Sequence, residues 1–336
     1  MNATNPKEIR VVWWNPYDLY HFNPSKTKKT GDPTRSRWPK NPVDYAEKLN
    51  RVCTALTELK SIVGEIDVLC LCETTNDAAE DLRKRIFPNH RLFSLDFLPQ
   101  TPSAQIAVIF PKSSANLIFE ESHPISVPNL SKDSRSMGVL EIKIGKKVIQ
   151  IIACHWTARM SKDSETLRER AGDHLGMYCY DFIKKDEENH HIIVLGDLND
   201  EPFDKSLGRL NTHRFRSRSR SAMHYADHYV KRLHLYNASW RLLGEKHGHI
   251  NKISSSFLDC AGTYYSGDYK QWYNFDQIIV SGNLLDSSKP FVNEDEIHIA
   301  SSPAFLTKGL PLQFEKTKAG YSGLSDHLPI TFTISI

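Results

Sequence analysis

The chain has 336 residues, of which 40% are hydrophobic and 25% are charged, and its formal net charge is +3. These values are ordinary for a soluble globular protein, and the small positive charge says little about partners. No apolar run reaches the roughly 20 residues that a membrane-spanning helix needs, and the polar stretch from Met1 to Arg10 lacks the apolar core of a secretory signal. We expect a cytoplasmic protein without a membrane span, in which one domain covers residues 9–336 after a disordered or short extension at residues 1–8.

The cysteines are spread thinly along the chain, and no two of them form a CxxC pair. They are Cys53, Cys70, Cys72, Cys154, Cys179 and Cys260. This spacing favours buried thiols in a reducing compartment over disulfides or a zinc site.

The first part of the chain alternates strand and helix patterns. Apolar side chains recur at three- and four-residue spacing over 42–63, and Gly64 follows, which together predict a helix. The polar loop at 21–42 is either a functional flap or simply mobile, since loops of this length are uncommon in compact domains. The elements predicted here are a strand at 9–15, a helix at 42–63, a strand at 66–73 and a short charged helix at 76–86.

The remainder of the chain is richer in strands, with irregular or helical structure expected at 203–250 and loops with one edge strand at 282–322. The other predicted elements are strands at 105–110, 138–144, 147–154 and 191–196, a helix at 164–185, and strands at 262–265, 272–280 and 325–336. Two sheets packed face to face, with the helices outside, would bury all these apolar strands in one core. The predicted fold class is therefore α/β, a four-layered α-β-β-α sandwich with two packed mixed β-sheets flanked by helices.

The run from His191 to Asp200 ends an apolar strand in Gly-Asp-Leu-Asn. Read as the end of a buried strand, it places Asp197 and Asn199 on one face, because strand side chains alternate. A carboxylate buried there is costly unless it is paired or binds a metal. Read as a turn, the same four residues carry no chemistry, since Gly, Asp and Asn are common in turns.

The same pattern, a polar or ionisable group at the edge of an apolar strand, recurs at six places. These are Asn15, Glu73, His155, Asp197 with Asn199, Asp276, and Asp326 with His327. The donors are hard oxygens and imidazoles, with no thiolate among them, and carboxylate and amide oxygens suit Mg²⁺, Mn²⁺ or Ca²⁺ far better than zinc. Because Mg²⁺ usually completes its shell with water and substrate phosphate, phosphate-ester chemistry is the leading reaction class.

The chain also resembles the endonuclease/exonuclease/phosphatase superfamily, and its bacterial nuclease-like members above all. The motifs occur in the family order and span residues 9 to 336, and the Gly-Asp-x-Asn and Ser-Asp-His motifs are specific in combination. They are Trp14-Asn15, Cys72-Glu73, Cys154-His155-Trp156, Gly196-Asp197-Leu198-Asn199, Phe275-Asp276-Gln277 and Ser325-Asp326-His327-Leu328-Pro329.

This resemblance implies a divalent-metal site for Mg²⁺ or Mn²⁺. Glu73 would be the principal metal carboxylate, with Asn15 and Asp326 beside it. Asp197 and Asn199 would orient the attacking water and the phosphate, and could hold a second ion. For Asn15, a plain turn residue is the alternative interpretation.

The resemblance also assigns the groups around the phosphate. His327 would contact the scissile phosphate or act as acid or base, with Asp276 holding its imidazole, and His155 would stabilise charge on the phosphorane. Arg135 and Arg159 match weaker phosphate contacts. The alternatives are a core histidine for His155, a surface arginine for Arg135 and a salt bridge for Arg159.

The substrate is less well defined by the sequence. The segment from Arg209 to Arg220 is the densest basic stretch, and with the tyrosines at 264–273 it would suit a nucleic acid substrate. A solvated basic loop and aromatic side chains packed under the sheet edge are the alternatives. We expect a metal-dependent phosphodiesterase, most simply a nuclease acting on DNA or RNA. The competing functions are a phosphatase or phosphodiesterase for inositol phosphates or phospholipid head groups, and a binding module that has lost catalysis.

Overall fold

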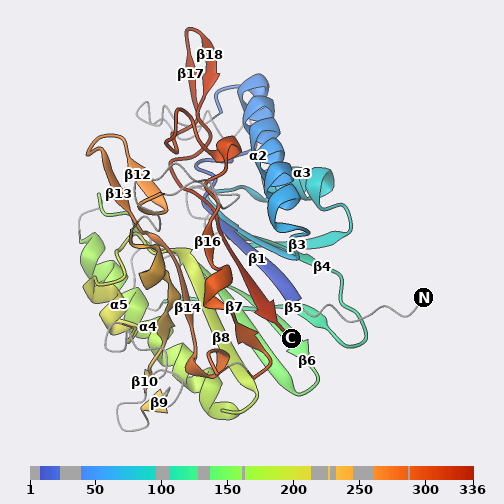
Figure 1. Cartoon of the computed structure of the whole chain (residues 1–336), viewed down its shortest axis with the longest axis vertical. Coiled ribbons are helices and arrows are strands. Elements are labelled where there is room, and N and C mark those ends of the chain that lie inside the picture. Colours follow the sequence, from blue (N-terminus) through green and yellow to red (C-terminus); the bar gives the residue numbers. More distant parts are fainter. Residues whose placement is uncertain are drawn as a thin grey trace.

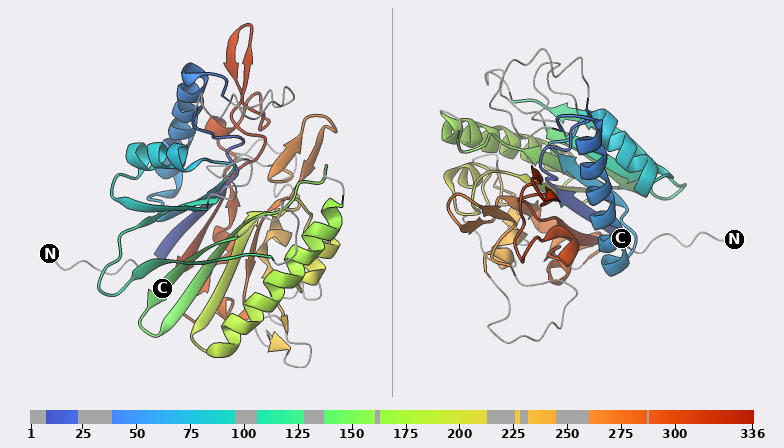
Figure 2. Two further views of the ribbon diagram at one scale, coloured as in Figure 1. Left: turned by 180° about the vertical axis from the view of Figure 1, so that it is seen from behind. Right: turned by 90° about the horizontal axis from the view of Figure 1, so that it is seen from above.

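The structure is a computed structural model, in which two mixed β-sheets pack face to face and helices cover the outer face of each (Figure 1, Figure 2). The predicted four-layered sandwich is confirmed. The residues that the structure describes are 8–22, 39–95, 106–127, 137–160, 163–212, 226–227, 232–244, 260–286 and 288–336.

The first sheet is built around the parallel pair of β1 and β2, and its other contacts are antiparallel. β19 lies beside β1 and carries two short edge strands, β15 and β16. In spatial order the strands are β15 (Phe291–Val292), β19 (Ile330–Ser335), β1 (Glu8–Trp14), β2 (Val68–Cys72), β4 (Ile106–Pro111) and β3 (His90–Leu95), with β16 (His298–Ile299) also pairing with β19.

The second sheet is built around the parallel pair of β7 and β8. In spatial order its strands are β11 (Tyr236–Asn237), β14 (Asp276–Val280), β8 (His190–Asp197), β7 (Lys147–His155), β6 (Met137–Ile144) and β5 (Ile118–Ile125). Three small two-stranded pairs stand apart from the main sheets. They are β9 (Ala226–Asp227) with β10 (Arg232–Leu233), β12 (Tyr264–Ser266) with β13 (Gln271–Tyr273), and β17 (Glu315–Thr317) with β18 (Gly320–Ser322).

The helices follow the predicted bounds closely. They are α2 (Pro42–Val63), α3 (Asn76–Ile86), α4 (Ser164–Lys185) and α5 (Lys205–Arg209). Asn41 fixes the start of α2, because its side-chain oxygen accepts hydrogen bonds from the backbone of Val43 and Asp44, both at 2.9 Å. α2 and α3 cover the first sheet, and α4 and α5 cover the second (Figure 2). Among the described residues, no helix has the length and apolar character needed to cross a membrane.

One hydrophobic cluster fills the space between the sheets and includes the buried faces of α2 and α3, and a second lies between the second sheet and α4. Along β8 the side chains of Ile193 and Leu195 belong to the first cluster, and those of Ile192 and Val194 to the second. This division follows from strand alternation. β8 is therefore buried on both faces, as its wholly apolar sequence predicts.

Several predicted elements differ from the structure. The predicted strand at 272–280 is two strands, because the chain leaves the β12–β13 hairpin at Asn274 and joins the second sheet at Asp276. The final strand begins at Ile330 rather than Ser325, just after Pro329, which cannot donate to a ladder. The prediction also missed β3 and β5, two strands that lie at the edges of their sheets.

Candidate active site

The polar strand ends predicted from the sequence meet at one end of the sandwich. Parallel neighbours β1 and β2 end next to Asn15 and Glu73, and parallel neighbours β7 and β8 end at His155 and Asp197, which are paired in register. β14 begins there too, because Asp276 lies opposite Asp197 in the antiparallel ladder. Asp326 and His327 precede β19 and reach the same place.

Asn15 lies between two acids. Its side-chain nitrogen Nδ2 is 3.3 Å from Glu73 Oε1 and 3.1 Å from Asp197 Oδ2, while its oxygen Oδ1 accepts a hydrogen bond from the Tyr17 backbone at 3.0 Å. In this orientation an N–H group of Asn15 faces the acids. Asn15 therefore holds the two carboxylates, and its role as a metal ligand stays a prediction.

Glu73 and Asp326 are the two carboxylates that the sequence predicts to hold a cation. Glu73 has a left-handed backbone, with φ of 49°, and its Oε2 accepts a hydrogen bond from the backbone of Asp18 at 3.2 Å. Asp326 accepts from Gln313 Nε2 through Oδ2 at 2.6 Å, and among the described residues its buried Oδ1 has no hydrogen-bond partner. A buried carboxylate oxygen without a donor is costly, and a hard cation would satisfy it. The acidic oxygens present therefore fit a divalent metal ion.

Two groups beside these acids were missed by the sequence reasoning. Burial and the Glu73 carboxylate raise the pKa of Asp18. Lys48 of α2 is buried, donates to the carbonyl of Leu324, and lies over the ring of Tyr17 with Nζ 5.7 Å from its centroid. Burial lowers the pKa of Lys48 to about 7. Its position on the apolar face of the predicted helix was the available signal.

A histidine and two carboxylates form the other half of the site. His327 Nδ1 lies 2.7 Å from Asp276 Oδ2, and its Nε2 lies 3.8 Å from Asp197 Oδ2. Trp13 on the first sheet donates its indole N–H to Asp276 Oδ1 at 2.7 Å. Burial lowers the pKa of His327, but the carboxylates of Asp276 and Asp197 outweigh it and raise the pKa to about 10. His327 is thus held as an imidazolium by its neighbours.

Asp197 lies at the centre of the cluster and is 2% exposed. His155 Nε2 lies 3.7 Å from its Oδ2 and 3.6 Å from Glu73 Oε1. Burial raises the pKa of Asp197 to about 7, although His327 opposes this shift. Gly196 allows the close approach of β7 behind this carboxylate, since a Cβ there would stand 2.2 Å from the Cys154 carbonyl oxygen.

The Gly-Asp-Leu-Asn segment combines the two interpretations left open by the sequence. The strand ends at Asp197, and Asn199 has a left-handed backbone with φ of 52°. The backbone of Asn199 donates to Asp197 Oδ1 at 3.0 Å, and its side chain donates to the carbonyl of Trp156 at 3.1 Å. The expectation that strand alternation aligns the two side chains is wrong, because the turn places Asn199.

A network of charged side chains, of which Arg168 and Asp200 are buried, supports this turn from behind. Arg168 of α4 lies 2.8 Å from Asp200 Oδ2, and Ser206 donates to the same oxygen at 2.6 Å. Arg159 donates through Nε to the carbonyl of Asn199 at 2.9 Å and pairs through Nη2 with Asp204. The sequence reasoning missed Arg168 and Asp200, and their place next to predicted site segments was the only available signal.

The remaining arginines predicted to contact substrate phosphate or a nucleic acid backbone differ in what the structure describes of them. Arg159 is engaged by the network just described, so a contact from it to substrate phosphate stays a prediction. Arg135 and residues 213–220 of the basic segment lie outside the described residues. Arg209, the first residue of that segment, lies 3.2 Å from Glu169 and 3.9 Å from Asp173 through its Nε.

The β12–β13 hairpin supplies aromatic side chains beside the site. Tyr264 stacks on Phe275 with centroids 5.1 Å apart and lies 4.7 Å from the His327 ring. Tyr265 and Trp272 form an edge-to-face pair at 5.3 Å, and Tyr269 is 77% exposed at the hairpin tip. Part of the hairpin thus packs against the site, and part remains exposed.

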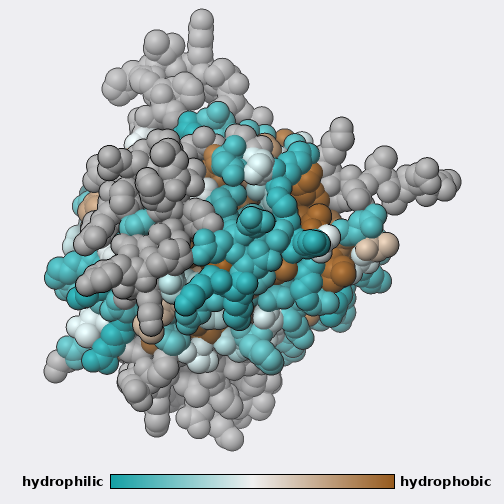
Figure 3. Space-filling model, turned by 90° about the horizontal axis from the view of Figure 1, so that it is seen from below, coloured by the Kyte–Doolittle hydropathy of each residue, from teal (hydrophilic) through white to brown (hydrophobic). Residues whose placement is uncertain are grey.

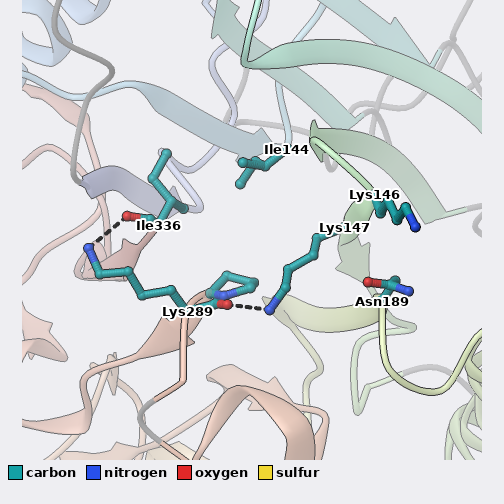
Figure 4. Close-up of a pocket in the computed structure, with 7 residues that line it drawn as sticks. Ile144, Lys146, Lys147, Asn189, Lys289 and Ile336 are labelled. Atoms are coloured by element: carbon teal, nitrogen blue, oxygen red, sulfur yellow. Dashed lines mark hydrogen bonds between the residues drawn. The ribbon is translucent and has the colours of Figure 1, made fainter.

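The opposite end of the sandwich holds a cavity of about 340 Å³ between the turn from β6 to β7 and the last residue of the chain (Figure 4). Lys147 donates there to the carbonyl of Lys289, and Lys289 donates to Ile336 O at 2.8 Å. Where its residues are described, the underside of the molecule is largely hydrophilic (Figure 3). None of the predicted site residues lines this cavity.

Two facing sheets, with acids and imidazoles at one end, define the DNase I-like sandwich, whose known members are phosphoester hydrolases that generally depend on a divalent metal. The model of the endonuclease/exonuclease/phosphatase family matches residues 21–335. The chain belongs to this family. No curated protein matches the sequence.

Several solved structures share the fold at low sequence identity. A humanized D. rerio TDP2 is 15% identical, with a TM-score of 0.56 and coverage of 98% of this chain and 100% of that chain. D. rerio TDP2 complexed with single strand DNA product is 16% identical, with a TM-score of 0.51 and coverage of 98% and 99%. A Bacteroides thetaiotaomicron mannosyl-6-phosphatase is 11% identical, with a TM-score of 0.54 and coverage of 98% and 100%.

Proposed function

We propose that this chain is a divalent-metal-dependent phosphodiesterase that cleaves nucleic acid, with residues 9–336 acting as one catalytic domain. The observation that carries the proposal is the Asp276–His327 pair, at 2.7 Å, facing a buried Asp197 beside Glu73 and Asp326. This arrangement offers an imidazolium for phosphate, an acceptor for a water proton and acids for a cation. Phosphoryl transfer needs these functions held in fixed positions.

Glu73 and Asp326 would hold Mg²⁺ or Mn²⁺, with Asn15 orienting Glu73. When bound, such a cation neutralises charge on the nonbridging oxygens of the phosphate. Side chains of the protein would accept the proton and orient the attacking water. Asp197, whose pKa burial raises to about 7, would accept a proton from the attacking water near neutral pH. Asn199 would orient that water beside it.

His327 and His155 would stabilise the phosphate from the other side. With Asp276 fixing Nδ1, the Nε2 proton of His327 is free to point at a phosphate oxygen or at the leaving oxygen. His155 lies within 4 Å of both Glu73 and Asp197, where it would meet developing charge on the phosphorane. Arg135 and Arg159 remain proposed phosphate contacts.

A nucleic acid substrate is supported by the basic segment from Arg209 to Arg220 and by the exposed side chain of Tyr269 at the tip of the β12–β13 hairpin. Arginines bind the backbone phosphates, and aromatic rings stack on bases. The D. rerio TDP2 structure with a single strand DNA product shares this fold. The competing proposal, a phosphatase or phosphodiesterase for inositol phosphates or phospholipid head groups, draws on the mannosyl-6-phosphatase of the same fold.

The test is a substrate panel. Single-stranded and duplex oligonucleotides, RNA, an inositol polyphosphate and a phospholipid head-group ester are incubated with the protein in Mg²⁺, Mn²⁺ or EDTA. We expect oligonucleotide cleavage that EDTA abolishes. Phosphate release from the inositol compound, with intact nucleic acid, would overturn the nuclease proposal.

A matched pair of variants tests the metal assignment within this panel. Glu73→Gln should require a higher Mg²⁺ concentration for half-maximal rate, because it removes one anionic ligand. Glu121→Gln, on the exposed side of β5, is the control and should leave the Mg²⁺ dependence unchanged. Equal Mg²⁺ dependence in the two variants would remove Glu73 from the metal site.

A further inference from the structure

We propose that Cys72, His155 and Asp197 form a second metal site, which contains a thiolate and takes Zn²⁺. One ligand atom from each of the three side chains lies within 4.8 Å of the others, and all three residues are buried. The set differs in kind from the oxygen ligands assigned to Mg²⁺, because it joins a sulfur and an imidazole to one carboxylate. The two sites would share the region around Asp197.

The fold explains how these side chains meet. Cys72 is the last residue of β2 in the first sheet, and His155 and Asp197 are paired at the ends of β7 and β8 in the second. Cys70 lies beside Trp13 in the parallel ladder, and the Trp13 indole reaches Asp276 on the second sheet. Side chains two residues apart share a face of a strand, so Cys72 faces the second sheet as well.

The distances suit a small tetrahedral ion. His155 Nε2 and Asp197 Oδ2 are 3.7 Å apart. Ligands at Zn–N, Zn–O and Zn–S distances of about 2.0–2.3 Å stand roughly 3.3–3.8 Å from one another in a tetrahedron. From the 4.8 Å limit, the thiol would need to move closer by about 1.0–1.5 Å at most.

The ligand chemistry selects the metal. Thiolate and imidazole favour Zn²⁺ and other borderline or soft ions over Mg²⁺ and Ca²⁺, which take oxygen ligands. Binding would form a Zn–S bond and release the thiol proton to solvent. Glu73 Oε1, at 3.6 Å from His155 Nε2, lies next to the remaining coordination position.

An inhibitory effect would follow from this binding, and this part rests on the proposed function. Zn²⁺ at Cys72 would occupy His155 and Asp197, the groups proposed to stabilise phosphate and accept the water proton. The enzyme would then lose activity in Zn²⁺ even with Mg²⁺ in excess. Cys72 would thereby make the active site sensitive to zinc.

A spectroscopic experiment tests the site without using activity. The metal-free full chain is titrated with Co²⁺, which replaces Zn²⁺ in tetrahedral sites and gives a near-ultraviolet thiolate-to-cobalt charge-transfer band. We expect the band in the wild type and its loss in Cys72→Ala. Cys70→Ala, on the same strand and face and equally buried, is the matched control and should keep the band.

The outcomes of the titration are decisive in each direction. A band that survives in Cys72→Ala, or that is absent from the wild type, overturns the proposal. Cys72→Ser provides a second variant that keeps the side-chain volume, and circular dichroism checks that each variant is folded. Bleaching of the wild-type band by stoichiometric Zn²⁺ would show that Zn²⁺ takes the same ligands.

Hydrolysis assays then test the inhibition. Each variant is assayed in Mg²⁺ with increasing Zn²⁺ and normalised to its own rate without Zn²⁺. We expect the Zn²⁺ concentration for half inhibition to rise at least tenfold in Cys72→Ala and to stay unchanged in Cys70→Ala. Equal inhibition of both would place the inhibitory ion at the oxygen ligands instead. A cobalt band with the expected Cys72 dependence, in a protein that cleaves no phosphoester, would refute the proposed function and leave the thiolate site standing.

Discussion

Two buried histidines near opposite ends of the sandwich take opposite protonation states. His327 lies between Asp276 and Asp197, and these carboxylates raise its pKa to about 10 despite its burial. His191 lies near the start of β8, the strand that ends at Asp197, and burial, aided by Lys147, lowers its pKa to about 4. The two imidazoles are 6% and 2% exposed, so burial does not distinguish them. The nearby carboxylates distinguish the two histidines, and these carboxylates lie where the strand ends meet.

The largest expected effect comes from removing the charged histidine. His327→Ala should lower kcat by about 10²–10⁴-fold, because it removes the group proposed to donate to phosphate. Thermal unfolding should show a folded protein. His123→Ala, on the exposed edge strand β5, is the control and should turn over like the wild type. Wild-type turnover in His327→Ala would refute the assigned role.

The charged network behind the Asp197–Asp200 turn provides the next test. Arg168→Ala should lower the free energy of unfolding by about 3–5 kcal/mol, because it leaves the buried Asp200 carboxylate without its main partner. Urea unfolding measures this change. Arg209→Ala breaks an exposed pair with Glu169 and should cost less than about 1 kcal/mol. Equal costs would show that Asp200 is not the charge that Arg168 balances.

The neutral histidine should govern stability on the acid side. In the unfolded chain His191 takes up a proton near pH 6.5, whereas in the folded chain it does so near pH 4. Its contribution to stability is therefore complete above pH 6.5 and is lost as the pH falls towards 4, by up to about 3 kcal/mol. Urea unfolding of His191→Gln between pH 7 and 4.5 should show a flatter pH dependence than the wild type. If His191→Gln has the same pH dependence of stability as the wild type, the acid sensitivity belongs to other groups. The control, His123→Gln, should leave the pH dependence of stability unchanged.

The smallest effect is expected where the first sheet supports the charged histidine. Trp13→Phe keeps the aromatic volume but leaves Asp276 Oδ1 without its donor, at a cost of about 1–3 kcal/mol. If the loss of this donor also weakens the hold of Asp276 on the His327 imidazole, kcat should fall by about tenfold while KM changes little. Steady-state kinetics separates the two parameters. Trp14→Phe, which removes a hydrogen bond to the His327 carbonyl instead, is the matched comparison.

Local patterns predicted much of the fold because they depend on nearby residues. The bounds of α2 match the prediction, since Asn41, Pro42 and Gly64 mark its ends in the sequence itself. β3 and β5 were missed because each lies at a sheet edge and mixes polar with apolar residues. The break at Asn274 was missed because no local pattern marks it, and the hydrogen bond of Asn274 there is to the distant Ser239 carbonyl.

The residues of the candidate site also differ in how far local sequence patterns predict them. Its strand-end residues were predictable because apolar runs that end in Asp, Glu or His are visible in the sequence, and parallel strands bring such ends together. The sequence did not predict roles for Lys48, Arg168 and Asp200, because each of these residues interacts with a partner that is distant in the sequence. The proposed Cys72 site was not predicted for the same reason, since Cys72, His155 and Asp197 lie far apart in the sequence and no CxxC pair marks them.

The Trp13 hydrogen bond to Asp276 joins the two sheets through the residue that holds His327. A small sliding of one layer over the other would separate this indole from its carboxylate long before the core opened to water. Mild denaturant should therefore abolish the proposed activity at concentrations where the helices and most of the strands remain folded. Under the proposed function, a damaged or half-assembled molecule would then be inactive towards phosphodiesters.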